Sequence, residues 1–136
     1  MAKNISEIEG VGDVYAAKLA EIGVTSVEKL LNIGATPKGR RELEQQTGIS
    51  HKLILRWVNH ADLFRIKGIA SEYAELLEAA GVDTVPPAVA QRNPANLQAK
   101  MVEVNQAKEL VRQVPGESLV ADWITQAKGL DRIVQY

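Results

Sequence analysis

One stretch of this sequence occurs twice. Residues 8–24 return as residues 66–82 with the same order of apolar, glycine and tyrosine positions. The matched positions are Gly10, Tyr15, Leu19 and Gly23 in the first copy and Gly68, Tyr73, Leu77 and Gly81 in the second. A unit repeated over this length constrains the whole architecture, because each copy is expected to adopt the same local structure. The chain is therefore predicted to consist of two related halves, residues 1–64 and residues 65–136.

Each copy predicts two helices joined by a tight turn. Glycine supplies the backbone angles that a short reversal needs, so Gly10-Val11-Gly12 is the predicted first turn. Asp13 is the expected N-cap of the helix that follows. In the second copy Ala70 replaces the second glycine, which marks that turn as degenerate. Gly23 and Gly81 are expected to end the two helices.

Capping signals extend the correspondence beyond the repeated stretch. Thr36-Pro37 and Asn93-Pro94 each place a capping side chain before a proline at the first helical position. Thr25 and Glu28 have the spacing of a capping box. The counterpart of that helix in the second half is expected to begin at Asp83, with Pro86 and Pro87 in its first turn.

Two tryptophans also occupy matched positions. Trp57 and Trp123 each precede an aliphatic residue and, four positions on, an alanine. Because a tryptophan buries a large area, each is expected to anchor the core of its half; a platform on which a base stacks is the alternative. The second copy carries extra residues around Asn105 to Glu117.

Composition favours an all-α fold. No stretch alternates apolar and polar residues at period two, and the segments between glycines and prolines follow helical spacing. The predicted fold class is therefore all-α, with about four to five short helices in each half. The chain has no cysteine, which excludes disulfides and thiolate metal sites. The N-terminus lacks the apolar core of a signal peptide and no segment approaches a membrane span, so a cytoplasmic location is expected.

Charge is distributed unevenly along the chain. The formal net charge is -1, which gives no bulk attraction for nucleic acid. Residues 38–65, however, carry six lysines or arginines against three acidic residues. A local basic segment in an otherwise acidic chain indicates where an anionic partner would bind.

The apolar residues and glycines of residues 5–19 resemble the helix-hairpin-helix motif of DNA repair and recombination proteins. The duplicated layout, with Gly34–Arg40 and Trp57–Leu63 between the two turns, resembles a bacterial family named domain of unknown function 4332. The resemblance covers nearly the whole chain. It implies two tandem helix-hairpin-helix repeats, the first over residues 1–64 and a second, degenerate one over residues 65–136.

In helix-hairpin-helix proteins the backbone N–H groups of the hairpin hold a DNA phosphate. The resemblance places those donors at Gly10, Val11 and Gly12. Asp13 follows at a position where many such motifs carry a lysine, and a carboxylate there would compete with phosphate. The alternative is that the glycines serve only to make the turn.

The basic segment supplies the other candidate contacts. Lys38, Arg40 and Arg41 cluster at the start of one expected helix. Residues 40–57 also have the pattern of a helix-turn-helix, with Gly48 at the turn and Ser50 capping the second helix. Glu44 falls where such motifs prefer a small residue, which predicts a looser crossing of the two helices. A stripe expected to face solvent on the second helix comprises His51, Lys52, Arg56 and Asn59. A solvated outer face is the alternative for these residues.

Nothing in the sequence indicates catalysis. Nucleotide-binding loops, nucleophile elbows and metal-ligand patterns are missing, and His51 and His60 are spaced for opposite sides of a helix. The chain is therefore expected to be a non-enzymatic module with no cofactor, no metal and no small-molecule substrate.

The sequence thus predicts a module that binds the DNA backbone without sequence specificity. The residues expected to carry it are Gly10, Val11, Gly12, Lys38, Arg40, Arg41, Lys52 and Arg56. The alternative is a scaffold for protein–protein interaction that has lost DNA binding. Convergence of the basic residues on the Gly10 turn would favour DNA, and their scatter would favour the scaffold.

Overall fold

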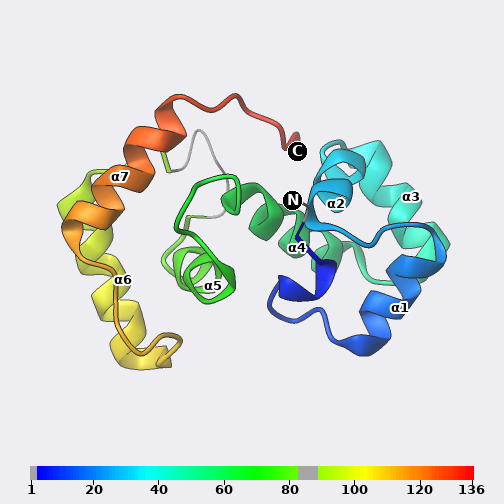
Figure 1. The fold of residues 1–136 in the computed structure, drawn as a ribbon, viewed down its shortest axis with the longest axis horizontal. Helices are drawn as coiled ribbons and strands as arrows, with labels where there is room; N and C mark the ends of the chain where they lie inside the picture. The colour runs from blue at the N-terminus through cyan, green and yellow to red at the C-terminus, as the bar shows by residue number, and fades with distance from the viewer. Residues whose placement is uncertain (1–2, 83–88) are drawn as a thin grey trace. The chain divides into compact units, whose positions relative to one another are not determined.

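The computed structural model describes residues 3–82 and 89–136, so the helix expected at Asp83 lies outside the described residues. Over these residues the chain is all-helical, with an isolated β-bridge between Asn4 and Ser26, which confirms the predicted fold class. None of the described helices is long and apolar enough to cross a membrane. The elements (Figure 1) are the short 3-10 helix η1 (Ile5–Glu7) and the α-helices α1 (Asp13–Glu21), α2 (Val27–Gly34), α3 (Pro37–Thr47), α4 (His51–Leu63), α5 (Ser71–Ala79), α6 (Pro94–Lys108) and α7 (Glu117–Lys128).

The chain divides into two compact units. Unit 1 comprises Met1–Asp62 together with Ile133–Tyr136, and unit 2 comprises Leu63–Arg132. The four residues 133–136, which the sequence alone assigns to the second half, therefore pack with unit 1.

Side-chain caps set the starts of α2 and α3 in unit 1. The hydroxyl of Ser26 accepts the N–H of Lys29 at 3.1 Å, so the cap of α2 is Ser26 rather than Thr25. Thr36 caps α3 as expected, accepting the N–H of Gly39 at 3.1 Å, and Pro37 occupies the first helical position. Gly48 ends α3 in the left-handed conformation that glycine adopts without strain.

Two glycines lie at close contacts between helices, one where α3 packs against α2 and one where α2 meets α4. A Cβ added to Gly39 would lie 1.7 Å from the carbonyl oxygen of Ile33, and one added to Gly34 would lie 2.3 Å from Val58. Neither position has room for a side chain. Gly39 therefore allows the close approach of α3 to α2, and Gly34 allows that of α2 to α4.

Unit 2 is built from α5, α6 and α7, with α6 packed against both of the others. Asn93 caps α6 through the N–H of Asn96 at 3.1 Å, which confirms the pairing of this cap with Thr36 in unit 1. The extra residues of the second copy lengthen α6 and form the loop after it. The amide of Asn105 holds that loop by donating to the carbonyl of Val111 and accepting its N–H, each at 3.0 Å.

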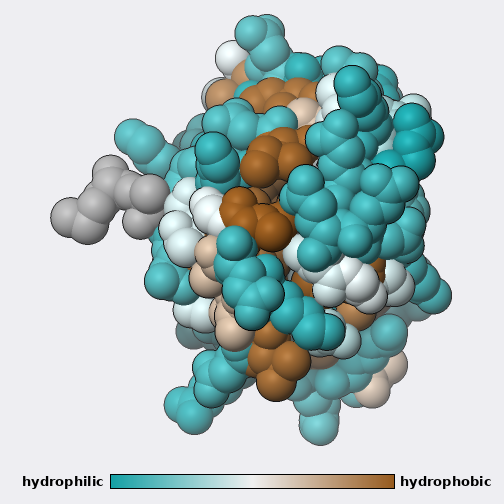
Figure 2. All heavy atoms as spheres, turned by 90° about the vertical axis from the view of Figure 1, so that its right-hand side faces the viewer, coloured by the Kyte–Doolittle hydropathy of each residue, from teal (hydrophilic) through white to brown (hydrophobic). Residues whose placement is uncertain are grey.

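A core of aliphatic residues and one tryptophan fills each unit. Trp57 in unit 1 and Trp123 in unit 2 are fully buried, as expected for core anchors. The outer face seen in Figure 2, on the side of unit 1 where α1 and α3 lie in Figure 1, is mostly hydrophilic and shows interrupted apolar areas. Apolar side chains thus collect inside the units, which is the burial that stabilises short helices.

Candidate nucleic-acid interface

The two copies of the repeated stretch form turns with the same backbone geometry. The N–H of Val11 donates to the carbonyl of Ile8 at 3.1 Å, and the N–H of Ile69 donates to Ile66 at 3.2 Å. Gly10 and Gly68 both have left-handed backbones, with φ of 93° and 98°. We call residues 8–12 the first turn and residues 66–70 the second turn.

Ala70 does not degrade the second turn. It has φ of -112° and ψ of -174°, against -82° and -177° for Gly12. Both are extended conformations that any residue adopts. The expectation that the second turn is degenerate was therefore wrong for its backbone, because the position that requires glycine is the first of the two, and both copies keep it.

Each turn presents unused backbone donors at the start of a helix. The N–H groups of Gly10 and Gly12, like those of Gly68 and Ala70, donate to no acceptor in the part of the chain that the structure describes. Gly12 is the N-cap of α1 and makes no side-chain cap, so Asp13 is the first helical residue rather than the expected cap. Open N–H groups at a helix start, where the helix dipole is positive, suit an anion. Of the predicted donors, only Val11 is already bonded, through its N–H to Ile8.

A tryptophan and a tyrosine support each turn from behind. The ring centroids of Tyr15 and Trp57 lie 5.2 Å apart, and those of Tyr73 and Trp123 lie 5.5 Å apart. Both indole N–H groups are buried without an acceptor among the described residues. Each lies against the turn glycine, since the indole nitrogen would be 3.0 Å from a Cβ on Gly68. The turns are thus seated on the rigid core of their own units.

The turn geometry predicts opposite effects of alanine at the two glycines of the first turn. We expect Gly10→Ala to lower the free energy of unfolding by about 1–2 kcal/mol, because a Cβ strains a left-handed backbone. Gly12→Ala should change it by less than about 1 kcal/mol, since the backbone there is extended and a Cβ would meet nothing within 4 Å. Urea denaturation followed by circular dichroism measures both. Equal effects of the two substitutions would contradict the assigned geometry.

Side chains distinguish the two turns. Glu9 and Asp13, which are exposed, flank the first turn, and their counterparts at the second are Lys67 and Ser71. The backbone of Lys67 is fixed to α7 by Gln126, which accepts its N–H at 2.9 Å and donates to its carbonyl at 3.2 Å. The exposed ammonium of Lys67 makes no ion pair among the described residues. The second turn is therefore a more favourable place for an anion than the first turn.

The predicted basic residues on α3 do not gather at the first turn. Lys38, Arg41 and Lys52 are exposed and Arg56 is half-buried. Within unit 1, Figure 1 shows the first turn at the lower edge, between η1 and α1, and α3 at the upper right. The cations carried by α3 are therefore separated from the backbone donors of the turn.

Arg40 is buried instead of exposed, contrary to the expectation that it contacts phosphate. Only 2% of its surface is accessible. Its guanidinium donates to the carbonyl of Gly34 at 2.7 Å and to the carbonyl of Gln135 at 2.6 Å. The centre of the Tyr136 ring lies 5.9 Å from the guanidinium carbon. Burial lowers the pKa of Arg40, and the interaction with Tyr136 opposes that shift. Arg40 thus holds residues 133–136 in place and is not available to a phosphate.

The predicted helix-turn-helix stripe is also interrupted. Asn59 was expected to face solvent, but it is buried and accepts the hydroxyl of Tyr136 at 3.0 Å. Glu44 caps α4, since its carboxylate accepts the N–H of His51 at 2.9 Å. Ser50 caps the same helix by accepting the N–H of Leu53 at 3.3 Å. These contacts give α3 and α4 a structural explanation that requires no base contacts.

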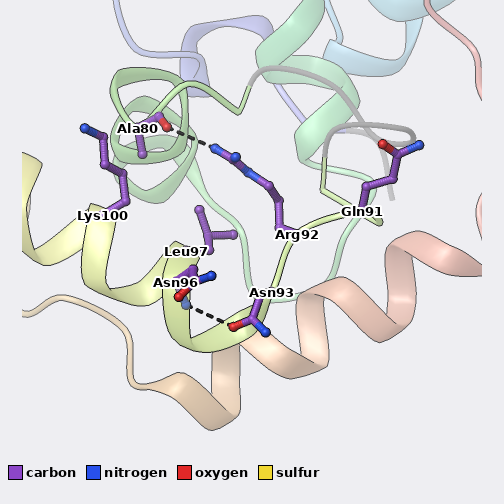
Figure 3. A pocket seen from close by; sticks show the side chains of 7 residues that line it. All are labelled: Ala80, Gln91, Arg92, Asn93, Asn96, Leu97 and Lys100. Atoms are coloured by element: carbon purple, nitrogen blue, oxygen red, sulfur yellow. Dashed lines mark hydrogen bonds between the residues drawn. The ribbon is translucent and has the colours of Figure 1, made fainter.

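A polar pocket of about 450 Å³ opens in unit 2 (Figure 3). It is lined by Ala80, Gln91, Arg92, Asn93, Asn96, Leu97 and Lys100. Arg92 donates to the carbonyl of Ala80 at 3.3 Å, just after the end of α5, and Asn93 caps α6. The ammonium nitrogen of Lys100 lies 3.8 Å from a carboxylate oxygen of Glu103. The polar side chains that line the pocket thus bind helix ends or form a surface ion pair. The pocket is not part of the candidate interface.

Comparison with known proteins gives one family match. The model of a family described as Domain of unknown function (DUF4332) matches residues 9–130, which include the first turn from Glu9 onward, the second turn and the helices α1 to α7. No curated protein and no solved structure matches the chain.

Proposed function

We propose that this chain, which belongs to the family Domain of unknown function (DUF4332), is a non-catalytic tandem helix-hairpin-helix module that binds the nucleic-acid backbone without reading sequence. The observation that carries the proposal is the pair of matched turns, each with two backbone N–H groups that have no acceptor in the described chain. A phosphate oxygen accepts such groups irrespective of the base sequence.

The two turns are unequal in the proposed binding. Each would hold one phosphate through its N–H groups, and at the second turn the ammonium of Lys67 adds a charge contact. At the first turn the carboxylates of Glu9 and Asp13 would repel the phosphate that this turn holds. We therefore assign the tighter contact to the second turn and the weaker one to the first.

The basic residues of α3 lie outside the proposed interface. Arg40 is buried, and α3, which carries Lys38 and Arg41, lies away from the first turn. Lys52 and Arg56, on α4, stay proposed as secondary backbone contacts of the same module. Binding is thus proposed to depend on the turns first and on the basic segment second.

Neutralising charges at the two turns tests this assignment. We expect Lys67→Gln to weaken binding of a short DNA duplex and to reduce the salt dependence of the affinity by about one unit of slope, because one phosphate contact is lost. Glu9→Gln should tighten binding, since it removes a negative charge beside a phosphate. Fluorescence anisotropy of labelled duplex at two salt concentrations measures both quantities.

The matched control removes cations elsewhere. The double substitution Lys38→Gln and Arg41→Gln eliminates more charge than Lys67→Gln, yet should change the affinity by less. If the double variant loses binding while Lys67→Gln retains it, the basic start of α3 rather than the second turn is the interface.

A protein-interaction scaffold is the second candidate function. It is favoured by the acidic residues beside the first turn and by the separation of α3, which carries Lys38 and Arg41, from that turn. Under this function DNA would not bind at low salt, and the anisotropy titration of the unsubstituted chain would show no change. That result distinguishes the two candidates.

A further inference from the structure

Unit 1 contains a peptide seat formed by Gly34, Ala35, Arg40 and Asn59, and residues 133–136 occupy it. We infer that this seat is a recognition site for short extended peptides that carry a valine and, two residues later, a tyrosine. The chain's own Val134-Gln135-Tyr136 is then the intramolecular ligand of the site. This inference does not depend on nucleic-acid binding by the turns, and it would give the scaffold function a partner.

The seat binds both backbone groups of Gln135. The N–H of Gln135 donates to the carbonyl of Ala35 at 2.7 Å, and the carbonyl of Gln135 accepts from Arg40 at 2.6 Å. The side chain of Gln135 is itself exposed and has no hydrogen bond in the described chain. Recognition through backbone groups tolerates many side chains, because every residue of a peptide carries the same N–H and carbonyl.

The neighbouring residues supply the sequence preference. Val134 is 1% exposed, so the seat buries an aliphatic side chain at this position. The hydroxyl of Tyr136 reaches the amide of Asn59, while 58% of the residue stays accessible. A buried aliphatic side chain followed by a half-open aromatic one is typical of an anchor and a polar handle in a peptide complex.

Arg40 makes the seat unfavourable when water occupies it in place of a peptide segment. Its guanidinium is buried, no carboxylate is among its partners in the described chain, and its Nε has no acceptor there. One of the two carbonyls that Arg40 binds belongs to the ligand segment. A buried cation that loses an acceptor is strongly disfavoured, so the site favours any extended segment that returns a carbonyl to Arg40.

The test uses the full chain with its own ligand disabled. The double substitution Val134→Asp and Tyr136→Ala should release residues 133–136, because Val134 is buried and burial of a carboxylate in its place is strongly unfavourable. A labelled, end-capped peptide with the native sequence of residues 130–136 should then bind this variant saturably, and at least about tenfold more tightly than it binds the unsubstituted chain, where the tethered segment competes at high effective concentration.

Two controls make the result specific. In the released variant, Arg40→Leu should abolish peptide binding, whereas Arg41→Leu, an exposed neighbour on the same helix, should leave it within about twofold. A peptide carrying aspartate in place of Val134 should not bind. The inference is overturned if the released variant keeps its helical circular dichroism but binds the native peptide no better than the unsubstituted chain.

A second measurement needs no substitution. Excess peptide added to the unsubstituted chain should shift the amide resonance of Gln135 as the tethered segment leaves the seat, and an unmoved resonance at saturating peptide argues against exchange. Concentration-dependent dimerisation that the peptide reverses would assign the seat to a second copy of the chain and overturn its assignment to a separate partner. Because the probe is a peptide, failure here leaves the DNA titration unaffected.

Discussion

Gly39→Ala should lower the free energy of unfolding of the chain by about 3 kcal/mol or more, the upper range for a single overpacking substitution. The added Cβ would lie 1.7 Å from the carbonyl oxygen of Ile33 and 2.9 Å from its carbonyl carbon. Both atoms belong to the backbone of α2, so no rotation of a side chain relieves the contact. Helix α3 must move away from α2, and the cap from Thr36 to the Gly39 N–H is disturbed with it.

Urea denaturation followed by circular dichroism measures this effect, with Gly12→Ala in the same unit as the matched control. Both substitutions add one methyl group to a glycine of unit 1, but only Gly39 has backbone in the way. A loss of less than about 1 kcal/mol for Gly39→Ala would show that α2 and α3 are not in the close contact described here.

Trp57→Ala should lower the free energy of unfolding by about 3–5 kcal/mol, and Trp123→Ala should lower it by a similar amount. Each ring is fully buried and lies between the turn glycine and the tyrosine of its unit. Removing it leaves a cavity directly behind the turn. We therefore expect the substitution at position 57 to loosen the first turn and the one at position 123 to loosen the second.

Phenylalanine at the same positions is the informative control. It keeps an aromatic ring against the tyrosine and removes an indole N–H that has no acceptor in the described chain. Trp57→Phe should therefore cost distinctly less than Trp57→Ala, since the cavity is smaller and a buried unsatisfied donor is gone. Denaturation midpoints and amide hydrogen exchange at Gly10 measure the two consequences. Alanine variants as stable as the phenylalanine variants would contradict the proposed support of the turns.

Short-range signals in the sequence predicted local structure well. Thr36 and Asn93 cap their helices, and Gly23, Gly48 and Gly81 have left-handed backbones. Such features depend on a few neighbouring residues and on the conformations that glycine and proline allow. The capping residue of α1 was placed one position late, because an aspartate beside a glycine fits the N-cap and the first helical position equally well.

Contacts between distant segments could not be predicted in the same way. Arg40 is buried by carbonyl groups of Gly34 and Gln135, and Asn59 is buried by the hydroxyl of Tyr136. Every residue has a backbone carbonyl, so the sequence does not indicate which carbonyls accept from an arginine. A buried arginine that binds carbonyls therefore cannot be distinguished in the sequence from one that faces solvent. For this reason a basic cluster at positions 38–41 indicated a single surface, whereas one of its members lies inside the unit.

The second turn was underestimated for a different reason. Ala70 in place of the second glycine predicts a degenerate turn, although only the glycine with positive φ is required and Gly68 retains it. Comparing the copies position by position does find the relevant signal, because Lys67 and Ser71 stand where the first copy has Glu9 and Asp13. Gln126, which fixes the backbone of Lys67, has no counterpart of the same type in the first copy, where His60 occupies the matched position.

The central claim is that the open N–H groups of the two turns bind backbone phosphate. Amide ¹H–¹⁵N spectra of the full chain, recorded while a short DNA duplex is added at about 50 mM salt, test it most directly, since phosphate contacts are strongest at low salt. We expect saturable shifts at Gly10, Gly12, Gly68 and Ala70, with the second pair saturating at the lower DNA concentration. Shifts confined to α3 and α4, or no shifts at saturating duplex, would contradict it.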